Sequence, residues 1–158
     1  MSTHVRDVMT RTPITIDPEA PLETAAAVMY EREVRHLPVV DEGGRLVGMI
    51  TDRDLRGVLL APVLAEHLSL GAQRRLRGLS ATLANLRVRD AMTWDAVTIE
   101  PGAPVARAAA IMFEGRFGCL PVIEAGRLVG IVTERDVLKA LAATLPAVRG
   151  MDPDNYLW

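Results

Sequence analysis

The sequence contains very little cysteine and histidine, and this scarcity excludes several kinds of site. Its 158 residues include one cysteine, Cys119, so an internal disulfide cannot form and a cluster of thiolates cannot hold a metal. The three histidines, His4, His36 and His67, are too far apart in the chain to indicate a ligand cluster. We therefore expect no structural metal and no conventional cofactor.

The sequence also lacks a long apolar run and a large net charge. No segment reaches the ~18 consecutive apolar residues of a membrane span, and residues 1–10 lack the apolar core of a signal peptide. We expect a cytoplasmic protein without membrane insertion. A net charge of −2 gives no general attraction to nucleic acid, and a composition of 49% hydrophobic and 24% charged residues is typical of a globular fold.

Two parts of the chain are copies of one unit. The run VRDVMT at residues 5–10 recurs as VRDAMT at 88–93, and the match continues, with one deletion, to TDRD at 51–54 and TERD at 133–136. Stacked arrays generally need three or more repeats to bury a continuous core, so two copies favour a pseudo-twofold pair over a solenoid.

Each copy has the same order of expected elements. Short β-branched runs predict strands, apolar residues at helical spacing from Leu22 and from Val105 predict helices, and glycine-containing turns separate two further apolar strands in each copy. The consecutive apolar residues of these last strands indicate a hairpin buried on both faces. The expected β-α-β-β-α units comprise strands at 14–16, 37–40 and 46–50 with a helix at 52–60, and strands at 97–99, 120–123 and 128–132 with a helix at 134–144.

The repeat divides the chain into four expected parts. These are a first unit at 1–60, a linker at 61–87 that we expect to be partly helical, a second unit at 88–145 and a C-terminal tail at 146–158.

Both copies resemble the cystathionine-β-synthase (CBS) domain. They carry its opening V-x-D-x-M, its central L-P-V and its closing glycine, hydrophobic residue and T-x-x-D, as in Gly48 to Asp54 and Gly130 to Asp136. The resemblance implies an α+β fold in which two β-α-β-β-α units pack through their sheets with pseudo-twofold symmetry. It also implies a homodimer and two clefts for an adenine nucleotide or adenosyl ligand such as AMP, ADP, ATP or S-adenosylmethionine.

The closing motif is chemically suited to such a ligand. A strand that ends at Thr51 or Thr133 and is followed by a helix places amide groups and the positive end of the helix dipole at the site, which favours phosphate. By the resemblance, Asp54 and Asp136 accept hydrogen bonds from a ribose diol, and the two threonines contact phosphate or ribose.

The same motif has a purely structural explanation. Thr-x-x-Asp at a helix start is also a capping box, which stabilises a helix by about 1 kcal/mol without any ligand. Capping and ligand binding can coexist, so both interpretations stay open.

The two sites differ in charge. Arg35 and His36 precede the central strand of the first copy, where the second copy has Gly118 and Cys119, so only the first has cationic donors for phosphate. We expect it to prefer a phosphorylated nucleotide. Further candidate ligand-binding residues are Arg53 and Arg135 after the threonines, and, by the resemblance, Thr12, Pro13, Ile14, Asp95 and Val97 around adenine.

Other functions receive less support from the sequence. The carboxylate pairs Asp52/Asp54 and Glu134/Asp136 are each two residues apart at a helix start, so their members point in different directions, and no histidine, lysine or tyrosine stands beside them in sequence. We therefore expect no enzyme. The arginines at 74–77 lack interleaved aromatic residues, so we expect no nucleic-acid binding. We expect a module that signals to a separate effector protein; a ligand-independent interaction module, with the aromatic tail at 155–158 clamping a partner, remains the alternative.

Overall fold

The computed structural model describes residues 3–65 and 85–144 of the chain. Within them the chain forms two compact units, and each is described here by itself. The N-repeat unit comprises residues 12–65, 85–97 and 125–128, and the C-repeat unit comprises residues 3–11, 98–124 and 129–144. The predicted tail and most of the predicted linker lie outside the described residues.

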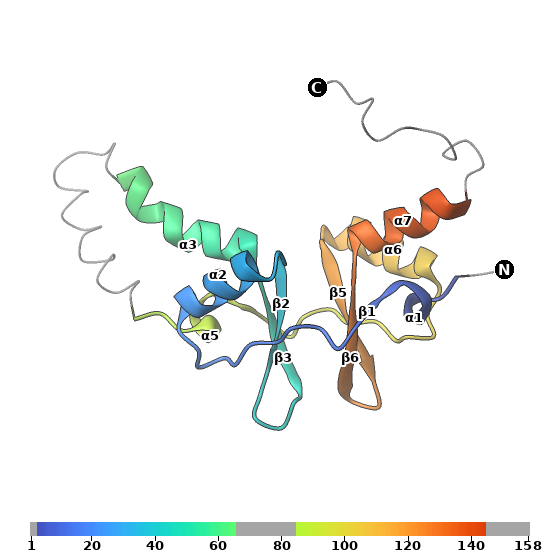
Figure 1. The fold of residues 1–158 in the computed structure, drawn as a ribbon, viewed down its shortest axis with the longest axis horizontal. Helices are drawn as coiled ribbons and strands as arrows, with labels where there is room; N and C mark the ends of the chain where they lie inside the picture. The colour runs from blue at the N-terminus through green and yellow to red at the C-terminus, as the bar shows by residue number, and fades with distance from the viewer. Residues whose placement is uncertain (1–2, 66–84, 145–158) are drawn as a thin grey trace, which may run out of the picture. The chain divides into compact units, whose positions relative to one another are not determined.

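The N-repeat unit is a three-stranded sheet with helices on one side (Figure 1). Strand order is β2-β3-β4, and both pairs are antiparallel. The elements are α2 (Leu22–Glu31), β2 (His36–Val40), β3 (Leu46–Thr51), α3 (Asp52–Ala65), α5 (Val88–Ala91) and β4 (Thr93–Trp94).

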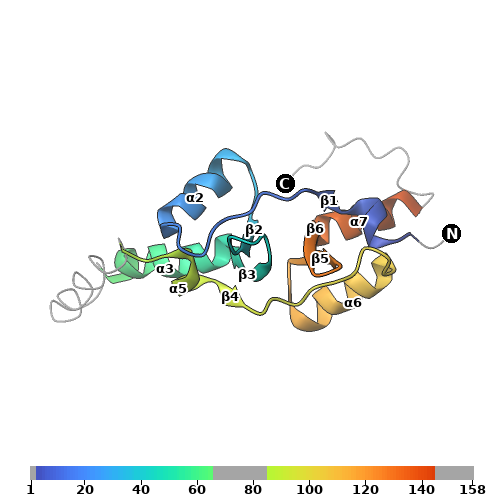
Figure 2. The ribbon, with the colours of Figure 1, turned by 90° about the horizontal axis from the view of Figure 1, so that it is seen from below.

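The C-repeat unit has the same plan. Its sheet has the order β1-β6-β5, and α6 and α7 lie side by side (Figures 1 and 2). The elements are α1 (Val5–Val8), β1 (Thr10–Arg11), α6 (Val105–Gly115), β5 (Cys119–Glu124), β6 (Arg127–Thr133) and α7 (Glu134–Thr144). The predicted α+β fold with two β-α-β-β-α repeats is confirmed.

Each unit has an aliphatic core between its sheet and its helices. In the N-repeat unit Leu22, Ala25 and Met29 form the buried face of α2 and pack on Leu37 and Ile50 of the hairpin. The fully buried Ala25 has almost no side chain, which lets the helix lie close to the sheet. The helical spacing predicted from sequence therefore identifies the core face correctly.

The central strands are buried on both faces, as predicted. Side chains of adjacent residues in a strand point to opposite faces, and Leu37, Pro38 and Val39 are all buried. Pro38 has no backbone N–H to donate. It is tolerated because β2 is an edge strand of the β2-β3-β4 sheet, so no neighbouring strand requires that donor. Its carbonyl oxygen accepts a hydrogen bond of 3.0 Å from the Ile16 amide.

The expected strands at 14–16 and 97–99 are shorter than predicted. Each is reduced to one parallel bridge, Ile16 to Val39 and Ile99 to Val122. Pro18 and Pro101 follow closely and cannot donate to a ladder, which limits the pairing. The opening strands proper are the two-residue β1 and β4.

The two copies exchange their opening segments. β1 belongs to the first copy but pairs with β6 of the second, and β4 of the second copy pairs with β3 of the first. Figure 2 shows the α5–β4 segment running beside β3. Val88 and Val5, the valines of the V-x-D-x-M motif, are fully buried in the unit built mainly from the other copy.

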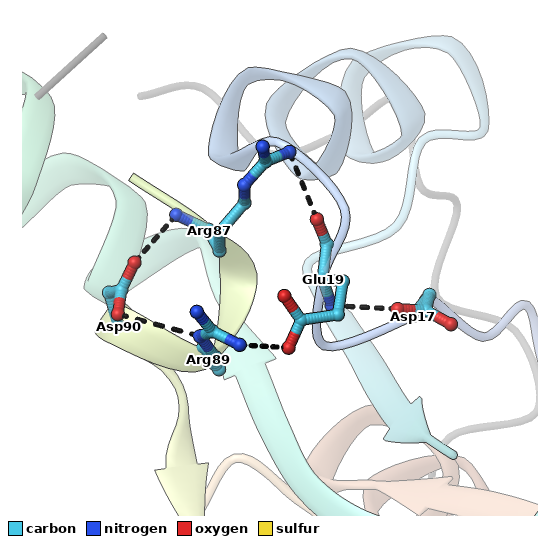
Figure 3. Close-up of polar contacts among 5 residues, drawn as sticks. All are labelled: Asp17, Glu19, Arg87, Arg89 and Asp90. Carbon is cyan, nitrogen blue, oxygen red and sulfur yellow. Dashed lines mark hydrogen bonds and ion pairs between the residues drawn. The ribbon is translucent and has the colours of Figure 1, made fainter. Parts of the chain in front are cut away.

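Backbone and side-chain contacts fasten α5 to the loop that precedes α2 (Figure 3). The Val88 amide donates to the Ala20 carbonyl oxygen and the Arg89 amide to the Pro18 carbonyl oxygen, each at 3.0 Å. The Arg89 guanidinium forms an ion pair with Glu19, and Arg87 donates to the Glu19 carbonyl oxygen. Because this ion pair is half exposed, the buried valine and the backbone bonds contribute most of the attachment.

Gly48 and Gly130 are required by the close approach of the exchanged strands. A Cβ atom at Gly48 would lie 2.5 Å from the Thr93 carbonyl oxygen and 3.1 Å from Met92 Sδ. At Gly130 it would lie 2.9 Å from the Thr10 carbonyl oxygen and 2.7 Å from Met9 Sδ. The closing glycine and the opening methionine of the repeat are therefore packing partners.

Gly48→Ala is expected to destabilise the protein by about 1–3 kcal/mol, because the new methyl group meets a backbone oxygen that cannot move without shifting β4. The control is Gly57→Ala in α3, where no atom lies within 4 Å and the substitution should instead stabilise by about 0.5–1 kcal/mol. Urea unfolding midpoints measure both. An unchanged midpoint for Gly48→Ala would contradict the pairing of β4 with β3.

Candidate functional site

The end of β3 and the start of α3 form a compact hydrogen-bonded motif around Thr51 and Asp54. Oδ2 of Asp54 accepts two hydrogen bonds from Thr51, one of 2.8 Å from its amide and one of 2.7 Å from its hydroxyl. The Asp54 amide donates to Thr51 Oγ1 at 3.3 Å. This is the reciprocal geometry of a capping box.

The C-repeat unit contains the same motif with nearly the same distances. Oδ2 of Asp136 accepts bonds of 2.8 Å and 2.7 Å from the amide and hydroxyl of Thr133, and the Asp136 amide lies 3.4 Å from Thr133 Oγ1. The structural interpretation of Thr-x-x-Asp is therefore realised in both units.

Each capping carboxylate keeps acceptor capacity. Both bonds to Asp54 use Oδ2, and Oδ1 has no hydrogen-bond partner among the described residues. An ionised carboxylate has about four lone-pair sites, so Oδ1 is still able to accept bonds from a donor outside the chain. The cap and a ligand contact are chemically compatible at this residue.

The first turn of α3 offers fewer free amides than a simple helix start. The Asp52 amide donates to the Arg35 carbonyl oxygen at 3.0 Å, and the Asp54 amide is used by the cap. In the first turn, the Arg53 amide is left without a partner among the described residues. The expected row of amides for a phosphate is therefore reduced to one group, and cationic side chains would have to supply the remaining contacts.

The structure brings Arg35 and His36 to the N-repeat site. His36 pairs directly with Thr51 in the β2–β3 ladder, and Arg35 is tied to the start of α3 through its carbonyl oxygen. The Arg35 and Arg53 side chains are exposed, and neither forms an ion pair with another described residue. Two guanidinium groups on residues at this helix start are thus uncommitted within the described part of the chain.

The C-repeat site has a different surrounding. The Glu134 amide donates to the Gly118 carbonyl oxygen at 3.1 Å, so the backbone contact is kept while the arginine side chain is missing. Arg135 is exposed, like Arg53. Cys119 begins β5 and is buried; its burial, with a smaller effect of the Glu134 charge, raises the pKa of its thiol to about 12. The thiol is therefore neutral at physiological pH and provides no charge at this site.

Thr12 and Asp95 hold an unusual backbone conformation that the sequence does not predict. They follow β1 and β4 and have φ values of 48° and 50°, in the left-handed region that residues other than glycine seldom adopt. Asp tolerates this region, whereas a β-branched Thr is strained there. An exposed aliphatic side chain follows each at the same spacing, Ile14 after Thr12 and Val97 after Asp95.

The expected adenine-contacting residues lie next to the edge strand of a sheet. Ile14, after Pro13, comes two residues before Ile16, which hydrogen bonds to Pro38 of β2. Val97 likewise comes two residues before Ile99, whose amide donates to the Pro121 carbonyl oxygen at 3.0 Å. Their contact with a ligand stays a prediction, as do the ligand contacts of the other candidate residues.

The fold is a tandem pair of β-α-β-β-α units that exchange their opening strands, which is a class of small paired modules. Comparison with known proteins identifies the family. The model of the CBS domain matches residues 5–61 and 88–143, and the chain belongs to the CBS domain family. A CBS domain-containing protein of Dictyostelium discoideum is 36% identical over 149 residues, which cover 94% of this chain and 97% of that protein.

Two solved structures with similar folds contain adenosyl ligands. CBSX2 in complex with AMP is 27% identical, with a TM-score of 0.72 over 89% of this chain and 96% of that one. The CBS domain pair of protein MJ0100 in complex with 5′-methylthioadenosine and S-adenosyl-L-methionine is also 27% identical, with a TM-score of 0.73 over 92% of this chain and 100% of that one.

Some relatives are enzymes, but the similarity covers only a small part of them. Homoserine O-acetyltransferase of Methanococcoides burtonii is 34% identical over 136 residues, and these amount to 23% of that protein. The match therefore lies in the CBS pair of a larger protein. In residues 3–65 and 85–144 of this chain, no helix combines the length and apolar character needed to cross a bilayer.

The thiol of Cys119 should make stability depend on alkaline pH. Its pKa is 9.0 ordinarily and about 12 in the folded chain, so above pH 9 the unfolded chain loses this proton first and folding becomes less favourable. Wild type should lose up to about 1.4 kcal/mol per pH unit relative to Cys119→Ala between pH 9 and 11. Urea unfolding across this range measures the difference; parallel stability curves would contradict a buried neutral thiol.

Proposed function

We propose that this chain is a regulatory module that binds an adenine nucleotide or a related adenosyl ligand at the Thr-x-x-Asp motif of one or both units. The observation that carries the proposal is the carboxylate of Asp54, and equally of Asp136, which is fixed by two bonds to Oδ2 while Oδ1 has no partner among the described residues. The bound AMP, 5′-methylthioadenosine and S-adenosyl-L-methionine of the two structural relatives support the ligand class.

The chemistry assigns different roles to the two residues of each motif. Ribose hydroxyls are donors, and a carboxylate oxygen held in place can accept from them without loss of side-chain entropy on binding. The Thr51 hydroxyl already donates to Asp54, so it would have to release that bond before it could donate to a phosphate. We assign the ribose contact to Asp54 and the positioning of its carboxylate to Thr51, with Asp136 and Thr133 in the same roles.

The charge difference between the units supports a difference in ligand preference. Arg35 and Arg53 make the N-repeat site suited to a ligand with a phosphate chain, because guanidinium groups bind phosphate oxygens with strong charge-assisted bonds. The C-repeat site has Arg135 but no counterpart of Arg35 and is suited to a less charged adenosyl ligand. His36, Thr12, Pro13, Ile14, Asp95 and Val97 remain proposed ligand-binding residues.

The hydrogen-bond partners of the acidic groups and the protonation of the thiol favour a regulatory function over a catalytic one. Asp52 forms an ion pair with Arg56 while Asp54 is held by Thr51, so the two carboxylates do not act as a pair. The raised pKa of Cys119 leaves no thiolate nucleophile at neutral pH. A ligand that binds one conformation preferentially shifts the population toward it, and an effector protein that prefers the same conformation responds. We propose a cytoplasmic homodimer that signals to such a separate protein.

The complete caps favour one alternative, a ligand-independent interaction module. In that case Thr51, Asp54 and their counterparts only stabilise helices. A substitution that keeps the cap but alters the ligand-facing oxygen separates the two functions.

Asp54→Asn and Asp136→Asn make this separation. The Asn carbonyl oxygen can take the place of Oδ2 in the cap, whereas its amide nitrogen cannot accept a bond from ribose. Loss of a hydrogen bond to a charged group costs about 1.5–3 kcal/mol, so affinity at the altered site should fall about 10- to 100-fold while the unfolding midpoint stays near that of wild type. Isothermal titration with AMP, ATP and S-adenosylmethionine measures binding, on protein shown to be free of nucleotide.

Asp54→Ala and Asp136→Ala serve as the matched comparison, because they remove cap and ligand contact together and should lower both stability and affinity. If wild type gives neither heat nor thermal stabilisation with any of the three ligands, the motifs act as caps alone. If wild type binds and both Asn variants bind equally well, the ligand lies elsewhere.

Arg35→Ala should weaken ATP binding about 10-fold at the N-repeat site and leave adenosine binding unchanged, because the guanidinium acts only on phosphate. Arg32→Ala is the control, since Arg32 is also exposed but lies at the end of α2. The Arg35 effect should shrink at high salt. Equal weakening of ATP by both variants would indicate general charge attraction instead of a phosphate site.

A further inference from the structure

The two exchanged segments are attached by the same backbone contacts. In the C-repeat unit the Val5 amide donates to the Ala103 carbonyl oxygen and the Arg6 amide to the Pro101 carbonyl oxygen, each at 2.9 Å. These bonds are the counterparts of the two that fasten α5 in the N-repeat unit. A difference in strength between the two attachments therefore has to come from side chains and from the backbone at the ends of the segments.

The ion pair of Figure 3 has no counterpart in the C-repeat unit. Arg6 corresponds to Arg89, but Gly102 stands where the first copy has Glu19. The Arg6 guanidinium is exposed and has no hydrogen bond or ion pair with another described residue. A Cβ atom at Gly102 would lie 3.5 Å from Arg6 Nη2, so the acid is missing at the position that this arginine approaches.

The segment at 3–11 also makes smaller apolar contacts than the segment at 86–94. Leu86 packs against the core of the N-repeat unit, and Thr3 stands at the corresponding position of the first copy. Met92 is 7% exposed and belongs to that core, whereas Met9 is only partly buried beside the core of the C-repeat unit. Because burial of apolar surface supplies most of the attachment, the segment at 3–11 is held less firmly.

The residue that follows each segment differs in the same direction. Thr12 and Asp95 both have a left-handed backbone, and Asp tolerates this conformation better than the β-branched Thr. The chain passes from the C-repeat unit to the N-repeat unit directly before Thr12, and the Ile16 amide is bound to Pro38 of the N-repeat unit. Thr12 is therefore fixed from both sides only while β1 stays on β6, and release of β1 relieves its strain.

We propose that residues 3–11 form a strap that opens the C-repeat unit about Thr12 as hinge, while the corresponding segment at 86–94 stays in place. The missing ion pair, the smaller apolar contacts and the strained hinge all lower the free energy of opening. Opening removes Val5 from its core and uncovers the edge of β6, whose backbone groups are then free to pair with another strand. The strap is a conformational device of one unit alone, and it does not depend on the proposed ligand.

Amide hydrogen exchange of the native protein, followed by NMR, measures the opening of both segments. The Val5 and Met9 amides report on the strap, and the Val88 and Met92 amides make the corresponding bonds in the other segment. After correction for sequence effects, the strap amides should be at least about 10-fold less protected than their counterparts. The slowest amides of β3 report on global unfolding and serve as the internal reference.

Two substitutions give the strap what the other segment has. Gly102→Glu supplies a partner for Arg6 and should raise the protection of the strap amides about two- to fivefold, the effect expected of an exposed ion pair. Thr12→Asp places at the hinge the residue type of the second copy and should raise it about fivefold, because the closed strap is then less strained. The slowest amides of β3 should change less than the strap amides in both variants, which separates local opening from global stability.

Glu19→Gly is the matched control, since it removes the ion pair from the other segment. It should lower the protection of the Val88 and Met92 amides and leave the strap amides unchanged. Equal protection of the two segments in wild type would overturn the strap. A weakly protected strap that responds to neither Gly102→Glu nor Thr12→Asp would overturn the proposed hinge and the proposed cause of opening.

Discussion

The backbone of each exchanged strand lies against a glycine of the other repeat, and the rest of each unit depends on this contact. Without β4 the N-repeat sheet would be a two-stranded hairpin, which is only marginally stable in water, and without α5 its core would lose Val88. The C-repeat unit depends on β1 and Val5 in the same way. Neither repeat completes its own core, so the two copies must fold as one cooperative pair.

Sequence reasoning recovered the parts of the fold that depend on local pattern. Helical spacing identified the buried face of α2, and consecutive apolar residues identified the buried hairpins, because both signals lie within one element. The exchange of β1 and β4 was not predictable in this way, since two nearly identical opening segments fit either partner equally well by pattern. From sequence, the closing glycine was only one element of the resemblance to the CBS domain, and the Thr93 carbonyl oxygen over Gly48 gives it a structural cause.

The candidate site illustrates a different limit of sequence reasoning. Thr-x-x-Asp predicts both a cap and a ribose-binding carboxylate, and the structure contains the cap in both units. The choice between the two functions depends on which carboxylate oxygen is used, and sequence carries no information at that level. The left-handed conformation of Thr12 was also beyond prediction, because Thr disfavours it and only the surrounding structure can impose it.

Comparison of the two copies within one chain indicates which residues maintain the fold. Positions that are the same in both, such as the motif valine, aspartate and methionine and the closing glycine, are accounted for by burial, capping or close packing. Positions that differ include Arg35 against Gly118, which directly precede β2 and β5, and Arg56 against Leu138, which are exposed on α3 and α7. A shared core therefore permits two different surfaces. A functional difference between the units, in ligand or in partner, has to arise from positions at which the two copies differ, and these two pairs are examples.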